Sequence, residues 1–436
     1  MNKQIRLNLI FHTSGRHDAG WKTFDDPTKL IDDVDHQIEY AKLAESALFD
    51  AIFLPDTPGS LGNIFLRKPR RGLDPAVLLA AVAMETKHLG LISTASSIHG
   101  DPYLVARSIA SLHQVSKGRA GWNIVTSQDD ETLLALGKPL DSKLDRETRY
   151  EKATEFVEIV TGLWDSLPDE AITANKEHDI YIDPTLTHPI DAHGKYYTSS
   201  GVLQMRGRYE GERPVLFQAG ISPRSREFGA KYADALFTSQ PHLEADRKFY
   251  SEVKEHAARF GRNPDHLLVL PGLYAVVGDT EEEARQHKAE VDELMDLDYL
   301  VNHLASQVGL PAEELDPHQP LPVELFETIP TDNDVINYRR NDIGSVAQAN
   351  NFTVKQLVHH NLTRGQRTIF GTPEQIADTI IEWHDTGVGD GFNVNAHVQP
   401  FGVERFKDVI SVLQDRGRFR KEYESTSFRQ NYGLPA

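Results

Sequence analysis

Short apolar segments alternate with helix-like segments in the first part of the chain, and this alternation limits the fold more than any other feature. Apolar runs typical of strands cover residues 5–11, 51–54, 89–95 and 120–125. Helical patterns lie between them at 32–48, from Asp74-Pro75 onward, and at 102–115. Repeated strand–helix units indicate a parallel sheet, because each crossover helix brings the chain back to begin the next strand in the same direction.

The same alternation continues along the rest of the chain. Further strands are expected at 214–220, 235–238, 267–277 (interrupted at Pro271-Gly272) and 391–396, and further helices at 147–163, 222–234, 242–260, from Thr280, from Thr372, and at 401–413. About eight strand–helix units result, which fits a (β/α)8 barrel better than a doubly wound sheet. We therefore expect one barrel domain over residues 1–436, with insertions at about 167–213 and 280–370 and a tail at 416–436 packed across the body.

The composition excludes several kinds of site and partner. A formal net charge of −19 argues against a nucleic-acid surface and against an anionic membrane surface. The chain has no cysteine, so disulfides, thiolate nucleophiles and cysteine metal sites are excluded. The first residues run into a strand without a signal-peptide core, and no apolar run approaches the roughly 18 residues of a membrane span. We therefore expect a cytoplasmic location and no membrane partner.

Small and polar residues end the strand at 120–125. Asn123 lies near its end, and Thr126 and Ser127 follow it directly. Such residues suit the carboxyl end of a barrel, where ligands bind, although the pattern fits a core strand with a polar exit equally well. Asp56, after the strand at 51–54, is open to two interpretations: it accepts hydrogen bonds from a ligand, or it caps its own loop.

The segment Gly220-Ile-Ser-Pro223 lies between a strand and the start of a helix. Free backbone N–H groups and the Ser222 hydroxyl at such a point can bind an anion such as a phosphate. The pattern alone favours the simpler interpretation, in which Ser222 is the N-cap of the helix.

Three other kinds of site are not supported by the sequence. His12, His17, Asp18, His99 and Asp101 lack the His-x-x-x-His or Glu-x-x-His spacing of a metal site on one helix, so no bound metal is expected. A Ser-His-Asp hydrolase is not indicated, because no Gly-x-Ser-x-Gly motif occurs. No Gly-x-Gly-x-x-Gly follows a strand, so the dinucleotide fingerprint is absent.

A series of motifs along nearly the whole chain resembles the luciferase-like flavin monooxygenases. The resemblance is closest to the branch with nitrilotriacetate, dibenzothiophene-sulfone and long-chain alkane monooxygenases. No single motif is specific, but their order and spacing together are. They are His17-Asp-Ala-Gly-Trp21, Phe49-Asp-Ala-Ile-Phe-Leu-Pro-Asp56, Asp101-Pro-Tyr103, the segment 116–127, Arg149-Tyr-Glu151, the segment 213–220, Gly371-Thr-Pro-Glu-Gln375, Asp390-Gly-Phe392 and the segment 416–423.

This resemblance implies an FMNH2- and O2-dependent monooxygenase of a two-component system on a (β/α)8 barrel. A flavin C4a-(hydro)peroxide would transfer one oxygen atom to a small organic substrate. FMN would be reduced by a separate NAD(P)H:FMN reductase and would reach this chain by diffusion. The resemblance also implies a homodimer or a larger homo-oligomer.

The resemblance assigns candidate site residues one by one. Asp56, Thr94, Asn123 and Tyr150 would line the flavin ring and ribityl chain, and Ser222 would hold the phosphate. The Ser93–Thr94 bond matches a position where relatives carry a non-proline cis peptide, a costly feature expected at a ligand site.

Three residues are candidates on the substrate side of the site. His17 and Trp21 are the candidate catalytic residues, and the insertion at 280–370 is a candidate lid. Arg146 stands where many relatives carry a flavin-contacting histidine. It would bring a fixed positive charge near the phosphate or the substrate without transferring protons, because arginine does not deprotonate.

Two other functions stay open on the sequence alone. One is a deazaflavin (F420)-dependent hydride-transfer oxidoreductase on a related barrel, and the other is a non-catalytic flavin-binding protein. The substrate is also open, since aminopolycarboxylates, sulfones, thioethers and long alkanes are all handled by similar chains.

Overall fold

Eight parallel strands close into a barrel in this computed structural model, which describes residues 4–59, 67–69, 72–126, 129–240, 242–332, 334–361 and 367–435. The ring closes because the last strand pairs with the first and the neighbours in between all pair in parallel. In order around the ring, its strands are β1 (Arg6–Ile10), β2 (Ala51–Leu54), β3 (Gly90–Ser96), β4 (Ala120–Val125), β7 (Val215–Ala219), β8 (Ala235–Thr238), β9 (Leu268–Val277) and β11 (Gly391–Ala396). The predicted (β/α)8 barrel is confirmed.

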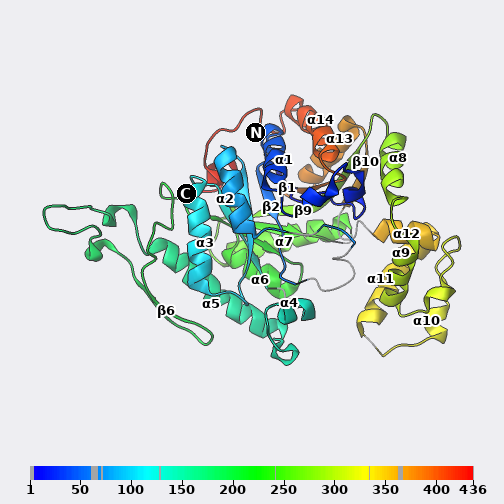
Figure 1. The fold of residues 1–436 in the computed structure, drawn as a ribbon, viewed down its shortest axis with the longest axis horizontal. Helices are drawn as coiled ribbons and strands as arrows, with labels where there is room; N and C mark the ends of the chain where they lie inside the picture. Colours follow the sequence, from blue (N-terminus) through cyan, green and yellow to red (C-terminus); the bar gives the residue numbers. More distant parts are fainter. Residues whose placement is uncertain are drawn as a thin grey trace.

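Helices surround this ring (Figure 1). They are α1 (Val34–Ser46), α2 (Pro75–Glu85), α3 (Pro102–Val115), α4 (Asp130–Ala135), α5 (Arg146–Asp165), α6 (Pro223–Tyr232), α7 (Leu243–Arg259), α13 (Pro373–Asp385) and α14 (Phe401–Asp415). Most begin where the sequence predicts, because a short polar side chain caps the first turn and proline often follows. Asp74 before α2 and Asp101 before α3 accept backbone N–H groups in this way.

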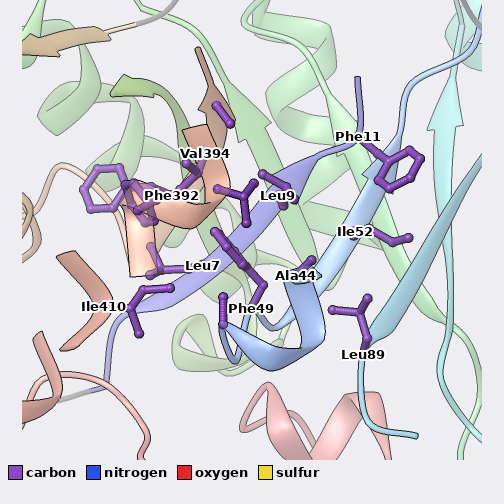
Figure 2. Close-up of a cluster of buried hydrophobic side chains, with 14 of the residues drawn as sticks. Leu7, Leu9, Phe11, Ala44, Phe49, Ile52, Leu89, Phe392, Val394 and Ile410 are labelled. Atoms are coloured by element: carbon purple, nitrogen blue, oxygen red, sulfur yellow. The ribbon is translucent and has the colours of Figure 1, made fainter. Parts of the chain in front are cut away.

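The largest apolar core lies between the barrel wall and the helices that cover it. β1 and β11 are neighbours, and every residue of β11 is buried. Figure 2 shows the contact of β1 and β11 with α1 and α14, made by Leu7, Leu9, Phe392, Val394, Ala44 and Ile410. This packing fixes the strands and therefore the positions of the residues at their carboxyl ends.

β9 is one unbroken buried strand, not the interrupted one predicted. β8 pairs with β9 up to Pro271, and beyond it β9 pairs with β10 (Arg367–Gly371), a further parallel strand outside the ring. Pro271 lacks an N–H group, and it lies where the strand changes partners, so it is tolerated there. β10 lies within the range predicted as an insertion, and its pairing with β9 shows that the chain has returned to the sheet by Arg367.

The two insertions differ in structure. Residues 167–213 carry the hairpin of β5 (Ile190–His193) and β6 (Thr198–Gly201), which projects away from the barrel (Figure 1). The later insertion forms its own apolar core from α9 (Leu297–Val308), α10 (Leu325–Thr328), α11 (Asp334–Asn350) and α12 (Val354–Asn361). The first helix of the same range, α8 (Glu281–Asp292), instead packs on the barrel, against β9 and β10. No helix among the described residues is long and apolar enough to span a membrane.

The C-terminal tail fills the amino end of the barrel with α15 (Phe428–Asn431). Phe428 is fully buried and stacks on Phe217 of β7, with ring centroids 6.0 Å apart. Gly90, the first residue of β3, leaves room for this ring, since a Cβ there would lie 2.6 Å from it. The buried ion pair of Arg429 with Asp234, at 2.8 Å, holds the tail in place. The amino end is therefore closed.

We expect Phe428→Ala to lower the free energy of unfolding by about 3–5 kcal/mol, because it leaves a cavity in the barrel core. Urea unfolding measures this loss. Tyr181→Ala is the control, because Tyr181 is 70% exposed on the projecting insertion, and it should change stability by no more than about 0.5 kcal/mol. Equal stability of the two variants would show that the tail does not support the barrel.

Candidate active site at the carboxyl end of the barrel

Thr94 and Asn123 form a buried hydrogen-bonded pair on neighbouring strands. The two residues are in register on β3 and β4. Thr94 Oγ1 donates to the carbonyl of Leu54 at 2.6 Å and accepts from Asn123 Nδ2 at 2.9 Å. Asn123 Oδ1 is buried and accepts no hydrogen bond from the described residues. Because buried acceptors are normally satisfied, this oxygen suits an N–H donor of a bound ligand.

Ser222 is the N-cap of α6, and its side chain accepts the backbone N–H of Ser225 at 3.3 Å. The simpler interpretation of this segment is therefore confirmed. No acidic residue lies in the first turn of α6, and the two arginines near its start are ion-paired, Arg224 with Glu147 and Glu227 and Arg226 with Glu252. Cations at a helix N-terminus oppose the helix dipole, whereas an anion there is stabilised by the dipole and by free N–H groups. An anion site at this position fits the residues present.

Tyr150 and Arg146 lie one turn apart on α5 but in different surroundings. Tyr150 is buried, and its ring centroid is 5.5 Å from that of Phe228 on α6. Arg146, the first residue of α5, is exposed. Tyr150 therefore joins the buried group between α5 and α6, and Arg146 lies outside that group.

A cavity of about 320 Å³ opens at the carboxyl ends of β1 and β2. Asp56 and His17 both line it, together with residues of the loops that follow these strands. Phe53 and Phe237 contribute apolar surface to it, and Asn395 at the end of β11 contributes an amide. The cavity therefore combines an apolar part with polar groups at strand ends, as expected for a small-molecule site.

His17 is held by partners at both ring nitrogens. Its Nδ1 accepts the backbone N–H of Ala19 at 3.1 Å, so Nε2 carries the proton and donates to Asp292 on α8 at 2.8 Å. Lys288 donates to the same carboxylate at 2.7 and 2.8 Å. The geometry suits a residue that fastens the loop after β1 to α8 better than a residue that exchanges protons with a substrate.

Asp292 is the centre of this cluster. Burial opposes its ionisation, but the hydrogen bond from His17 and the charge of Lys288 outweigh burial and hold its pKa below the ordinary value. The ring centroid of His397 is 5.5 Å from that of His17, and burial lowers the pKa of His397 to about 3. His397 is therefore neutral at physiological pH and leaves Lys288 as the main cation beside Asp292.

Trp21 lies outside the cavity at β1 and β2. It belongs to the 3-10 helix Gly20–Thr23 and lines a separate cavity together with Arg67, Met295 and Tyr299. The structure thus brings His17 and Asp56 to one cavity, joins Thr94 to Asn123, and separates Trp21 from all of them. Residues near the candidate site that the sequence analysis missed are Arg16, which lines the cavity at β1 and β2, and Gln218, whose Nε2 donates to Ser225 at 2.8 Å. A polar amide inside the apolar run 214–220 was the available signal for Gln218.

Two further expectations concern the same region. The cis peptide expected at Ser93–Thr94 is wrong for this structure: among the described residues the one cis bond joins Gln399 to Pro400. Ser93 and Thr94 instead continue a regular parallel ladder with β4. Within the described ranges, no three or more histidine and carboxylate side chains are arranged to hold a metal ion.

The fold and this rim define a (β/α)8-barrel protein whose ligand site lies at the carboxyl ends of its strands. Residues 9–390 match the family model described as luciferase-like monooxygenase, and the chain belongs to this family. The N-acetyl-S-(2-succino)cysteine monooxygenase of Bacillus subtilis (strain 168) is 38% identical over 99% of this chain and 97% of its own length.

Other comparisons agree with this assignment. Nitrilotriacetate monooxygenase component A of Aminobacter aminovorans is 34% identical over 99% of this chain and 97% of its own length. A crystal structure of a riboflavin lyase with modified FMN and riboflavin has a TM-score of 0.79 and 28% identity, covering 98% of this chain and 95% of that one. The chain is a flavin-dependent monooxygenase.

We expect Asp292→Asn to lower the free energy of unfolding by about 3 kcal/mol at neutral pH, because it leaves Lys288 buried beside a neutral group. Because the pKa of Asp292 in the folded protein is below the ordinary value of 3.8, the stabilisation is complete above that pH. It is lost as the pH falls through the folded-state value, so the gap between wild type and variant should close in acid.

Urea unfolding at a series of pH values measures this gap. Asp279→Asn is the control, since Asp279 is an exposed carboxylate paired with Arg405 and should contribute about 0–1 kcal/mol. A gap for Asp292→Asn that does not change between neutral and acid pH would contradict the role given to its charge.

Proposed function

We propose that this chain is the oxygenase of a two-component system, which uses FMNH2 and O2 to add one oxygen atom to a small organic substrate. The observation that carries the proposal is the run of site residues along neighbouring strand ends. Asp56 follows β2, the Thr94–Asn123 pair joins β3 to β4, and Ser222 begins the helix after β7. Such a continuous run suits one extended ligand with a phosphate at one end.

The residues present fit FMN. Asn123 Oδ1 offers a buried acceptor without a partner among the described residues, and the N-terminus of α6, which has no acidic residue in its first turn, offers backbone N–H groups to an anion. Asp56, Thr94 and Tyr150 would lie along the rest of the flavin, and Ser222 would hold its phosphate. When bound in its reduced form, the flavin supplies the activation of O2. The related riboflavin lyase structure with modified FMN supports this assignment.

The protein itself would bind, orient and shield. The tail packs into the amino end of the barrel and would keep water from reaching the site from that side. Apolar side chains such as Phe53 and Phe237 line the cavity beside Asp56 and limit its hydration. His17 would keep the loop after β1 in place through Asp292. Arg146 stays permanently charged and would act on the ligand through its charge alone.

A separate reductase is part of the proposal. The relative from Aminobacter aminovorans is named as component A of its enzyme, and no dinucleotide fingerprint occurs in this chain. The monooxygenase relatives over the full chain favour this function over deazaflavin-dependent hydride transfer and over flavin binding without catalysis. A homo-oligomer and a cytoplasmic location remain predictions.

We expect Ser222→Ala to weaken FMNH2 binding by about 1 kcal/mol or more, the scale of a hydrogen bond to a charged group. Riboflavin, which lacks the phosphate, should bind wild type and variant alike. Anaerobic fluorescence titration measures both affinities. Thr372→Ala removes the N-cap of α13 and controls for the loss of a cap alone. Equal FMNH2 affinity in wild type and Ser222→Ala would show that the Ser222 hydroxyl does not bind the phosphate.

We also expect turnover to require an added FMN reductase. The purified chain with NADH, FMN and substrate should consume no NADH. Any FMN reductase should restore turnover, because FMNH2 diffuses from the reductase to this chain and the two proteins need not bind each other. Mass spectrometry of the product should show one added oxygen atom. Rapid NADH consumption by the chain without a reductase would indicate a self-sufficient flavoenzyme.

A further inference from the structure

Arg16 lines the cavity at β1 and β2 and lies on the loop after β1, which the backbone holds in place. Its backbone N–H donates to Ala396 at the end of β11 at 2.8 Å, and the next N–H, of His17, donates to His397 at 3.1 Å. Gly15 has a φ of +90°, and a Cβ at that position would lie 2.5 Å from the carbonyl oxygen of His397. The loop therefore fits closely against β11, and the position of Arg16 at the cavity is fixed by the barrel.

The guanidinium group of Arg16 is poorly satisfied by the protein. Its side chain is 22% exposed, and its one ion pair with a described residue joins it to Asp18 at 3.9 Å, beyond hydrogen-bond distance. Guanidinium carries five N–H donors in a planar fork that matches a carboxylate. A half-buried cation with unused donors at the wall of a cavity suits an anionic ligand.

Lys68 adds a second cation to the same wall. It lines the cavity, its side chain is 18% exposed, and it pairs with the same oxygen of Asp18 that faces Arg16. Asp18 is thus closer to Lys68 than to Arg16 and does not form a hydrogen bond with the Arg16 guanidinium. Asp56 is the acidic residue on the cavity lining. It lies at the end of β2, on the side of the expected flavin residues. It forms no ion pair with Arg16. Arg16 is therefore the cation on this wall whose N–H donors are left without a hydrogen bond among the described residues.

We infer that the substrate is a small polycarboxylate, which binds with a carboxylate on Arg16 and Lys68 while its apolar part faces Phe53 and Phe237. The inference rests on the proposed function, since it names the substrate class of the same site. Two relatives that cover nearly the whole chain are named for N-acetyl-S-(2-succino)cysteine and for nitrilotriacetate, both polycarboxylates. The cations at the cavity give a physical reason for that class of substrate in this chain.

Binding is tested without turnover by titrating the full-length protein calorimetrically with tricarballylate and with its neutral trimethyl ester. Wild type should bind tricarballylate and not the ester. Arg16→Gln should weaken tricarballylate binding by about 10-fold or more, as expected when a charged hydrogen bond is lost. Arg16→Lys, which keeps the charge and loses the fork, should give an intermediate affinity. Arg405→Gln is the matched control, since Arg405 is 27% exposed, pairs with Asp279 and lies outside the cavity.

Turnover adds a second measurement. With a reductase present, N-acetyl-S-(2-succino)cysteine and nitrilotriacetate are compared with neutral thioethers and sulfones. Arg16→Gln should raise KM for the carboxylate that is oxidised by about 10-fold and leave kcat within about two-fold, since uniform binding is lost. FMNH2 affinity should be the same in wild type and Arg16→Gln.

The outcomes separate this inference from the proposed function. Failure of wild type to bind tricarballylate, equal binding of the ester, or unchanged binding in Arg16→Gln overturns the inference. Oxidation of neutral compounds alone also overturns it and leaves the proposed function standing. Arg16-dependent binding of tricarballylate without any FMNH2 binding supports the anion site and overturns the proposed function.

Discussion

Closure of the amino end of the barrel by the tail is the contact on which the rest of the site depends. Phe428 and Tyr432 enter the ring from a segment more than 200 residues away from Phe217, which they contact. The ring of eight strands is wide enough only for side chains to fill, and glycine at the start of β3 admits the aromatic ring of Phe428. With one end filled, the polar strand ends at the other end are the ones left to bind a ligand.

A second constraint is the attachment of the loop after β1. The loop would be mobile if only its ends were fixed, but His17 ties it to Asp292 on α8 and its backbone bonds tie it to β11. Lys288, which belongs to α8, completes the charge balance at Asp292. Since α8 leads into the helical insertion, the position of Arg16 at the cavity depends on contacts from both halves of the chain. Residues distant from the cavity thus position the cation that faces it.

Local patterns were sufficient to predict most of the barrel. The helix at 102–115 and the strands at 120–125 and 391–396 have the predicted bounds, because caps, proline and apolar runs define them locally. The partner change of β9 at Pro271 was not predictable, since it depends on β10, almost 100 residues later. The cavity was harder still: Trp21 follows His17 in one motif, yet the 3-10 helix turns it into another cavity. Motifs identify residues of a family, whereas the fold decides which of them share a cavity.

The candidate site at the carboxyl end of the barrel has two parts, which are built from different kinds of segment. The part from β2 to α6 consists of strand ends and a helix start, so its geometry follows from the barrel itself, and its residues were found through the family motifs. The part around β1 and β11 takes its cations from loops, Arg16 from the one after β1 and Lys68 from the segment before α2. Loops tolerate change more readily than strand ends. A family that keeps one cofactor and varies its substrates would be expected to vary this second part. Charged side chains such as Arg16 and Lys68 distinguish between substrates more strongly than an apolar surface does. An apolar substrate in this cavity would leave the donors of the Arg16 guanidinium without an acceptor, and that cost, more than any lost contact, would exclude it.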